Sequence, residues 1–234
     1  MIFADEAIAF TPQISSRRAP LRHLGSGHKE MKLTEVPEDH DQIMNVARHV
    51  MRNWSFYHFR DTSTEADIRQ HYYIEQNRYL RADAGNLAPF LYMLKRTKLD
   101  YYQRIISTIR LIAPFFGDFV LEPMELDPSR IILNWKERGS DMLFGPHQLS
   151  DGTLRMMALV ALLLQPQEKL PSLIVIDEPE LGLHPYAINV LASLIKSISE
   201  ETQVIVSTQS VGLIDNFEPE DIVVVDRPEQ ESIF

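Results

Sequence analysis

Apolar and polar positions follow a regular succession of patterns in the second half of the chain. Residues 172–177 contain a continuous apolar run that ends in an acid, which is typical of a parallel strand covered on both faces. Residues 203–207 predict another buried strand, and residues 221–226 predict a third. Residues 185–198 have apolar side chains at helical spacing, and a short helix is expected near 212–216. The order strand–helix–strand–helix–strand predicts an α/β layer with parallel pairing and right-handed crossovers.

Two β-rich runs precede this layer, at residues 119–126 and 130–136. The turn signal Asp127-Pro128-Ser129 lies between them, so the two runs predict an antiparallel hairpin. Residues 156–164 are apolar on nearly all sides and rich in helix formers, which indicates a buried helix.

The first half of the chain is less regular. Residues 62–80 are polar and ambiguous, and no internal repeat or low-complexity tract is present. The other segments predict, in chain order, a loop at 15–27, a helix at 41–51, a strand at 54–59, and helices at 86–98 and 100–116.

Composition narrows the class of protein. The chain has 234 residues, 44% hydrophobic and 24% charged, which is typical of a soluble globular protein. It has no Cys, which excludes a disulfide framework, a thiolate metal site and a Cys nucleophile. No apolar run reaches the roughly 18 residues of a membrane span. The first residues also lack the features of a signal peptide, so we expect a cytoplasmic protein with no membrane segment.

Charge is unevenly distributed along the chain. The formal net charge is -10, from 23 Lys and Arg against 33 Asp and Glu. Residues 165–234 contain three basic and 13 acidic side chains, so a uniformly basic nucleic-acid-binding protein is disfavoured. A solvated face or, alternatively, a DNA-facing arm explains the basic stretch of Arg78, Arg81, Lys95, Arg96 and Lys98.

The most specific segment is 173–185, in which apolar residues lead into Asp177 and Glu178. This is the Walker B pattern of nucleotide hydrolases, and it places the acids where ligands bind in open α/β sheets. Asp177 is the candidate Mg²⁺ ligand, usually through a water, because Mg²⁺ prefers hard oxygen donors and keeps part of its hydration shell. Glu178 is the candidate catalytic residue that orients and polarises the attacking water. The alternative is an ordinary strand that ends in two solvated acids, and the Leu-Gly-Leu-His-Pro run that follows disfavours it.

Two further segments place polar residues where phosphate can bind. Ser150, Asp151 and Gly152 lie at the predicted start of a helix, where free N–H groups and the helix dipole favour an anion. Ser150 can act as both helix cap and phosphate ligand. Gln209 follows the strand predicted at 203–207 and can position a γ-phosphate or water. A plain helix cap is the alternative for each segment.

In this order and spacing the three segments resemble the signature loop, the Walker B motif with its D-loop, and the switch motif of ABC-type ATPases. They are most similar to SMC/RecF-like predicted AAA family ATPases, which include anti-phage ATPases. The resemblance implies a P-loop NTPase core of ABC/RecF-like type, with a mostly parallel sheet, a helical arm or lobe, and an antiparallel hairpin. It implies a partial ATPase lobe with a helical insertion at residues 1–116 and a C-terminal ATPase lobe at residues 117–234.

The resemblance also implies the roles of individual residues. Ser150, Asp151 and Gly152 match the signature loop, where transporters usually have Leu-Ser-Gly-Gly-Gln. His184 belongs to the D-loop match, at the nucleotide-binding surface, and is expected to pack or contact a partner subunit rather than bind metal. Gln209 takes the position usually held by a switch His, and Gln cannot act as a cation or base.

A Walker A segment, Gly-x-x-x-x-Gly-Lys-[Ser/Thr], is missing from the pattern. The nearest candidate, at residues 24–30, has the wrong spacing, a His before the Lys, and no Ser or Thr after it. In the family that the chain resembles, the P-loop lies near the N-terminus. We therefore expect the chain to be the C-terminal two-thirds of such an ATPase, starting after its P-loop. The resemblance implies ATP hydrolysis, but without Walker A we expect this 234-residue chain alone to be inactive.

The resemblance implies ATP and Mg²⁺ as cofactors and a head-to-tail homodimer, with ATP binding as a dimerisation switch and hydrolysis as the reset. DNA, or a nuclease or other effector, is expected as a further partner in DNA-associated or anti-phage defence processes. The alternative is a non-catalytic scaffold fragment that completes a partner's nucleotide site. A small-molecule hydrolase finds no support, because no Gly-x-Ser-x-Gly motif is present.

Overall fold

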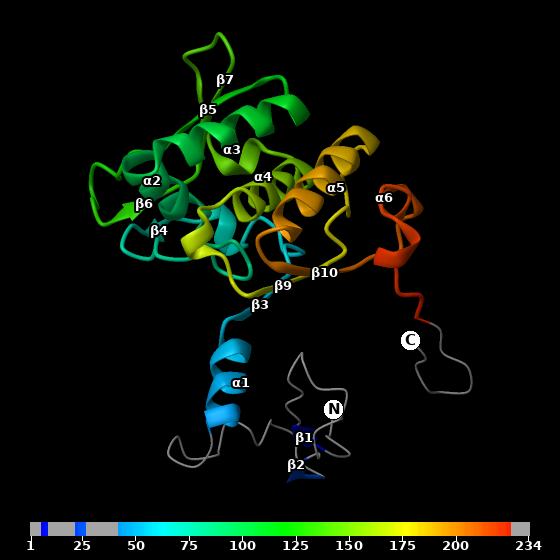
Figure 1. Cartoon of the computed structure of the whole chain (residues 1–234). Helices are drawn as coiled ribbons and strands as arrows, with labels where there is room; N and C mark the ends of the chain where they lie inside the picture. Colours follow the sequence, from blue (N-terminus) through cyan, green and yellow to red (C-terminus); the bar gives the residue numbers. More distant parts are fainter. Residues whose placement is uncertain (1–5, 9–21, 27–41, 226–234) are drawn as a thin grey trace. The chain divides into compact units, whose positions relative to one another are not determined.

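The apolar runs of the second half form the predicted parallel pair, β9 (Leu173–Asp177) and β10 (Gln203–Ser207) (Figure 1). The register pairs the first residues of the two strands with each other and the last residues with each other. Both strands therefore end at the same edge of the sheet. Strand β3 (Trp54–Tyr57) completes the sheet in the order β10-β9-β3, which makes β9 the central strand.

Burial differs between the two parallel strands. Ile174 and Ile176 of β9 are fully buried, as expected for a central strand. The expectation that β10 is also buried is wrong. Among the described strands β10 lies at the edge of this sheet, and its residues Gln203, Ile205 and Ser207 are exposed.

The strand expected at residues 221–226 is not present where the structure describes this segment. Asp221 ends the 3-10 helix η5 (Pro219–Asp221), and residues 222–225 belong to no regular element. Val223, Val224 and Val225 are exposed. Consecutive β-branched residues favour an extended chain, but a strand also requires a neighbouring strand to pair with.

Helices pack beside the sheet and form most of the core. Helix α4 (Asp151–Leu163) is buried from Met156 to Leu163, which confirms the predicted buried helix. It packs against α3 (Leu99–Ile112) and α5 (Pro185–Ser199), while α2 (Leu87–Thr97) packs against α3 (Figure 1). Helix α6 (Val211–Ile214) contacts α5.

Helix α3 ends before residue 116, where the sequence predicted its end. Pro114 follows Ala113, and the residue before a proline is disfavoured in the helical conformation. Strand β5 (Phe116–Val120) begins two residues later.

Antiparallel pairing joins β5 to β7 (Asn134–Glu137), as the hairpin prediction requires, and β8 (Leu143–Phe144) extends this sheet. The hairpin prediction is wrong for the residues nearest to the predicted turn. Residues 130–131 form β6 (Arg130–Ile131), which pairs with β4 (Tyr72–Tyr73) instead. Only the bridge between Pro123 and Ile131 joins the two inner segments within the described residues. The two residues of β4 lie in the segment that the sequence left ambiguous.

The computed structural model describes residues 6–8, 22–26 and 42–225. The chain divides into two compact units, Met1–Trp54 and Ser55–Phe234. The two-lobe division expected at residue 116 stays a prediction. The first unit contains helix α1 (Gln42–Arg52), which confirms the helix predicted there, and the antiparallel strands β1 (Glu6–Ile8) and β2 (Arg22–Gly25).

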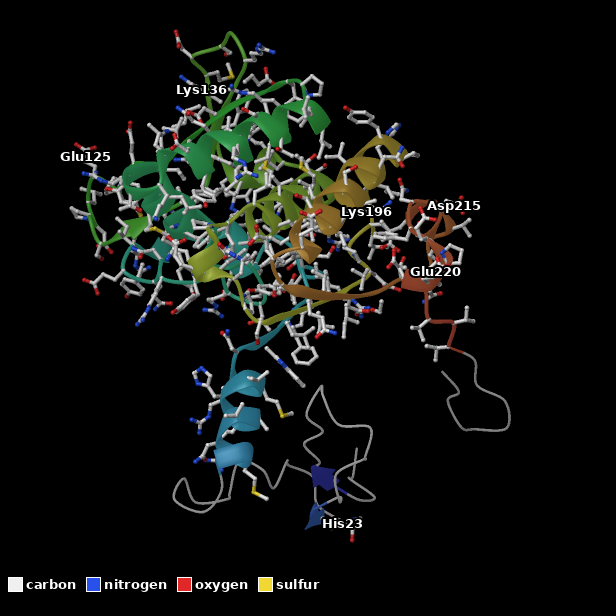
Figure 2. All side chains as sticks on the ribbon, in the orientation of Figure 1. His23, Glu125, Lys136, Lys196, Asp215 and Glu220 are labelled. Atoms are coloured by element: carbon white, nitrogen blue, oxygen red, sulfur yellow. The ribbon has the colours of Figure 1, made fainter. Side chains whose placement is uncertain are left out.

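The loop predicted at residues 15–27 is wrong at β2, and residues 15–21 and 27 lie outside the described residues. The rejected Walker A candidate at 24–30 is described only at Leu24, Gly25 and Ser26. No described helix is long and apolar enough to cross a membrane. In the second unit, Figure 2 labels charged side chains that are all exposed, namely Glu125, Lys136, Lys196, Asp215 and Glu220.

Candidate functional site

The two acids of the Walker B pattern lie at the edge where both parallel strands end. Asp177 is the last residue of β9 and is paired with Ser207, the last residue of β10. The Ser207 hydroxyl donates a hydrogen bond to Asp177 Oδ1, and the Glu178 N–H donates to the Ser207 carbonyl at 2.8 Å. The carboxyl ends of parallel strands are the usual ligand-binding edge of an open α/β sheet.

Glu178 leaves the strand in a left-handed backbone conformation, with φ of 46°. For a residue other than Gly this conformation costs about 1–2 kcal/mol, and such strain concentrates at functional positions. The side-chain amide of Gln209 donates to Glu178 Oε1 at 3.3 Å. The structure thus brings together the two residues that the sequence predicted to be catalytic.

Arg60 is the positively charged residue that contacts the acids at this edge of the sheet, and sequence analysis did not identify it as a site residue. Its guanidinium pairs with Asp177 and lies 3.3 Å from Glu178 Oε2, so one side chain bridges both acids. The Arg60 side chain is 57% exposed, and an ion pair with this exposure contributes about 1 kcal/mol or less. Its only signal in the sequence is its place just after the Tyr57-His58-Phe59 run.

Ser150 is the N-cap of α4, as predicted. Its hydroxyl accepts a hydrogen bond from the Thr153 N–H at 3.2 Å. Asp151 and Gly152 form the first turn of the helix. Among the described residues no hydrogen bond joins Ser150 or Gly152 to Asp177.

Gly152 is in close contact with the predicted D-loop. A Cβ at this position would lie 2.2 Å from the carbonyl oxygen of Gly182, so only Gly fits here without a shift of the backbone. Gly182 itself has φ of 78°, which also favours Gly. His184, two residues on, is the N-cap of α5, and its Nδ1 accepts from the Tyr186 N–H at 3.3 Å.

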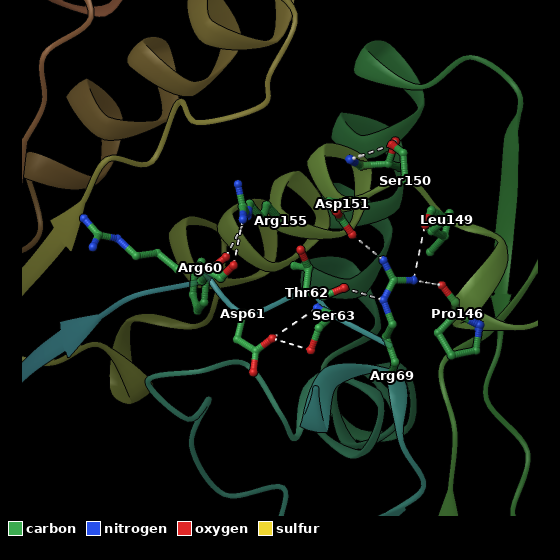
Figure 3. A network of polar contacts seen from close by, with 12 residues as sticks. Arg60, Asp61, Thr62, Ser63, Arg69, Pro146, Leu149, Ser150, Asp151 and Arg155 are labelled. Carbon is green, nitrogen blue, oxygen red and sulfur yellow. Dashed lines mark hydrogen bonds and ion pairs between the residues drawn. The ribbon is translucent and has the colours of Figure 1, made fainter. Parts of the chain in front are cut away.

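Arg155 of α4 joins its helix to two other segments near the acids, and Figure 3 shows its contact with the chain at Arg60. Its guanidinium donates to the carbonyls of Phe59 at 2.8 Å, Arg60 at 2.7 Å and Leu181 at 3.2 Å. A small hollow lined by Arg60, Arg155 and Asp177, among others, lies at this junction. The turn after the Walker B acids and the chain that follows β3 are thus both joined to the helix that carries the predicted signature loop.

Arg69 is a buried cation at the far end of the segment that begins at Arg60 (Figure 3). Its guanidinium pairs with Asp151 and also donates to the backbone carbonyls of Thr62, Pro146 and Leu149. Sequence analysis did not identify this network, because the partners of Arg69 at Leu149 and Asp151 are about 80 residues away.

Asp61 closes the turn between Arg60 and the 3-10 helix η2 (Asp67–Arg69). Its Oδ1 accepts from the hydroxyl of Ser63 at 2.7 Å and from the Ser63 N–H at 3.1 Å. These two hydrogen bonds hold the pKa of the Asp61 carboxyl below its ordinary value. Asp61 is therefore ionised at neutral pH, and its charge stabilises the turn.

The donors at the sheet edge fit Mg²⁺. Asp177 and Ser207 offer hard oxygen atoms side by side. No group of three or more His, Asp or Glu gathers anywhere in the described residues, so protein atoms would fill few of the coordination positions. Mg²⁺ usually keeps several waters and binds through one or two carboxylates together with substrate phosphates, which matches this arrangement.

An α/β sheet whose central strand ends in paired acids is the arrangement of an AAA-type ATP-binding domain. A family model described as "AAA domain, putative AbiEii toxin, Type IV TA system" matches residues 20–215. The chain belongs to this family. The predicted resemblance to AAA family ATPases is thereby confirmed.

Solved structures of SMC head domains are similar to the chain. One, from a study of ATP-driven dimerization and DNA-stimulated activation of SMC ATPases, has 21% identity and a TM-score of 0.47, over 61% of this chain and 86% of that one. The Smc head domain with a coiled coil and joint from Pyrococcus yayanosii has 21% identity and a TM-score of 0.48, over 64% of this chain and 29% of that one.

A third structure, an Smc head bound to the C-terminal winged-helix domain of ScpA, has 19% identity and a TM-score of 0.44, over 61% of this chain and 42% of that one. The chain therefore spans less than half of the length of two of these three structures. The comparison with curated proteins found no match.

Proposed function

We propose that the chain is an ATP-binding and ATP-hydrolysing subunit of the ABC/RecF-like type. The observation that supports this most is the sheet edge at which Asp177 and Glu178 follow β9 and contact Ser207 and Gln209. Separate strands bring these four polar residues to one place, which a solvated strand end does not require. Membership of an AAA domain family supports ATP as the nucleotide.

Each residue of this edge has a role in the proposal. Asp177 and Ser207 would hold Mg²⁺, partly through water, and the ion would supply positive charge to offset that of the ATP phosphates. Glu178 orients the attacking water and accepts its proton. Gln209 holds Glu178 through its amide, at 3.3 Å, and acts by orientation because an amide carries no charge.

The active unit in this proposal is a head-to-tail dimer. Ser150, Asp151 and Gly152 of one subunit meet the γ-phosphate of the nucleotide held by the other, and His184 lies at the same subunit boundary. ATP binding closes the dimer and hydrolysis reopens it.

The wider setting is DNA-associated or anti-phage defence. The family description, which names a toxin of a toxin–antitoxin system, supports the defence setting. DNA and a nuclease or other effector are the partners that we propose, and the acidic C-terminal region adds no support for DNA.

One observation favours the alternative of a non-catalytic module. The 234 residues contain no Gly-x-x-x-x-Gly-Lys-[Ser/Thr] to cradle a nucleotide, so the chain could instead complete the site of a partner that has one. An in-frame motif of this kind directly upstream of the Met1 codon would favour the ATPase. Its absence there would favour the module.

Turnover provides the direct test. The 234 residues contain no Gly-x-x-x-x-Gly-Lys-[Ser/Thr] motif and are expected to be inactive alone, so the test uses the chain extended upstream to include such a motif. We expect this extended chain to release phosphate from ATP in the presence of Mg²⁺, and Glu178→Gln in it to lose at least about 99% of this activity, since removing a general base costs about 10²–10⁴-fold. Glu200→Gln is the matched control, because Glu200 is an exposed acid at the end of α5 and should leave turnover unchanged. Glu178→Gln that hydrolyses ATP at the wild-type rate contradicts the assigned role.

A further inference from the structure

Arg69 is 5% exposed, yet it carries a positive charge, and a cation at this depth is stable only when its donors are all paired. Nε donates to the Thr62 carbonyl at 2.8 Å and Nη2 to Asp151 Oδ1 at 2.8 Å. Nη1 donates to the carbonyl of Pro146 and, at 3.2 Å, to that of Leu149. A single planar guanidinium thus fixes four acceptors, three of which lie between residues 146 and 151.

These three acceptors belong to the loop that leads into α4. Pro146 begins the 3-10 helix η3 (Pro146–Gln148), and Leu149 follows it directly. Asp151 is the first residue of α4, next to the N-cap Ser150. Arg69 therefore fixes the backbone on both sides of the residue proposed to bind phosphate. Figure 3 shows the guanidinium facing this loop.

Charge gives Arg69 a second effect on the loop. Asp151 has a side chain that is 64% exposed, in a loop proposed to meet the γ-phosphate of ATP. An unpaired carboxylate at that place would repel the phosphate. The ion pair with Arg69 offsets this negative charge and holds Oδ1 toward the protein interior.

We propose that Arg69 is the positioning residue of the predicted signature loop. It fixes the carbonyls of Pro146 and Leu149 and neutralises Asp151, so that Ser150 and Gly152 can approach the nucleotide held by the partner subunit. This inference rests on the proposed function, and it adds a residue from a distant part of the chain to the trans half of the site. Arg69 itself touches no nucleotide in this scheme.

Amide hydrogen exchange tests the positioning without any need for activity. We expect Arg69→Met to accelerate exchange at residues 147–154 about tenfold or more, because hydrogen bonds to a charged group are lost. Arg110→Met is the control, since Arg110 also donates to a backbone carbonyl, that of Gly117, at a distance in sequence from the loop. If Arg69→Met does not fold, Arg69→Lys, which keeps the charge and loses the planar fork, takes its place. Exchange at 147–154 no faster than in Arg110→Met overturns the proposal.

Subunit mixing tests the action in trans. Arg69→Lys and Glu178→Gln should each be impaired in ATP hydrolysis when alone, and a mixture of the two should regain activity. In the mixed dimer one site combines the intact Glu178 of one subunit with the intact loop of the other. A mixture that stays as inactive as its components shows that Arg69 acts on its own subunit's acids, and overturns the assignment.

The electrostatic part has its own readout. Adding Asp151→Asn to Arg69→Met should recover part of the lost hydrolysis, because it removes the uncompensated charge, whereas a purely structural loss would not respond. If Asp151→Asn does not recover any hydrolysis, the argument that Arg69 neutralises Asp151 is contradicted. The hydrolysis experiments use the upstream-extended chain of the turnover test. If that chain does not hydrolyse ATP at all, the proposed function fails, and the exchange experiment still decides whether Arg69 positions the loop.

Discussion

A Cβ atom on Gly152 would lie 2.2 Å from the carbonyl oxygen of Gly182, so the first turn of α4 touches the turn after the Walker B acids backbone to backbone. Nothing in the local sequence of either segment indicates this contact. It means that the predicted signature loop and D-loop of one chain pack directly on each other, and that Gly at 152 is required by packing whether or not phosphate binds there.

Gly152→Ala should therefore destabilise the protein, although Gly→Ala within a helix normally stabilises by up to about 1 kcal/mol. We expect a loss of about 1–3 kcal/mol in the free energy of unfolding, the usual cost of overpacking. Urea unfolding followed by circular dichroism measures it. Gly212→Ala in α6 is the control, because its Cβ would meet nothing closer than Ser210 Oγ at 3.8 Å. Equal effects of the two substitutions would contradict the backbone contact.

The bridge from Arg60 to both acids predicts competition with a divalent cation. Arg60→Gln should raise the affinity of nucleotide-free protein for Mn²⁺, used in place of Mg²⁺, by about fivefold, which corresponds to an exposed ion pair of about 1 kcal/mol. Free Mn²⁺ is measured by electron paramagnetic resonance. Adding Asp177→Asn should abolish the gain. An unchanged affinity in Arg60→Gln shows that Arg60 and the ion do not share Asp177.

The positive φ of Glu178 predicts an inverted preference between Gly and Ala. Glu178→Gly should be more stable than Glu178→Ala by about 1 kcal/mol, because only Gly adopts this conformation without strain. Both substitutions remove the same exposed side-chain contacts, so their difference in thermal unfolding isolates the backbone. At Glu200, which has φ of -72°, the order should reverse. A higher stability for Ala at both positions would mean that Glu178 is not strained.

The sequence predicted the parallel pair and the buried helix, because each depends on a local apolar run and on the geometry of parallel strands. The sequence-based prediction of burial failed where burial of a strand depends on a neighbouring strand. Ile205 and the run Val223–Val225 have the composition of buried strands, but the position of a strand within its sheet is a property of the whole fold.

The same distinction applies to the site. Glu178 and Gln209 could be predicted because a motif places each of them next to a strand end. Arg60 and Arg69 could not, since their acidic partners are more than 80 residues away and an isolated Arg in a polar segment usually lies on a solvated surface. Both arginines lie in or beside residues 62–80, the segment with the weakest pattern.

Tyr102 gives a prediction about pH. It is buried, and its hydroxyl donates to Asp118 Oδ1 at 2.7 Å. Burial, reinforced by the Asp118 carboxylate, raises the pKa of Tyr102 well above its ordinary value of 10. The folded protein thus keeps a proton that the unfolded chain releases near pH 10. Burial raises the pKa of Tyr57 as well, so it acts in the same direction.

The free energy of unfolding should therefore fall as the pH rises above about 10, because the unfolded chain then binds fewer protons than the folded one. Tyr102→Phe should make this fall less steep, and should cost about 1 kcal/mol at pH 7 for the lost hydrogen bond. Urea unfolding between pH 7 and about 11 measures both effects. Tyr79→Phe, at a tyrosine that is 54% exposed, should leave the slope unchanged. An identical alkaline slope in wild type and Tyr102→Phe would show that Tyr102 titrates alike in the folded and unfolded states.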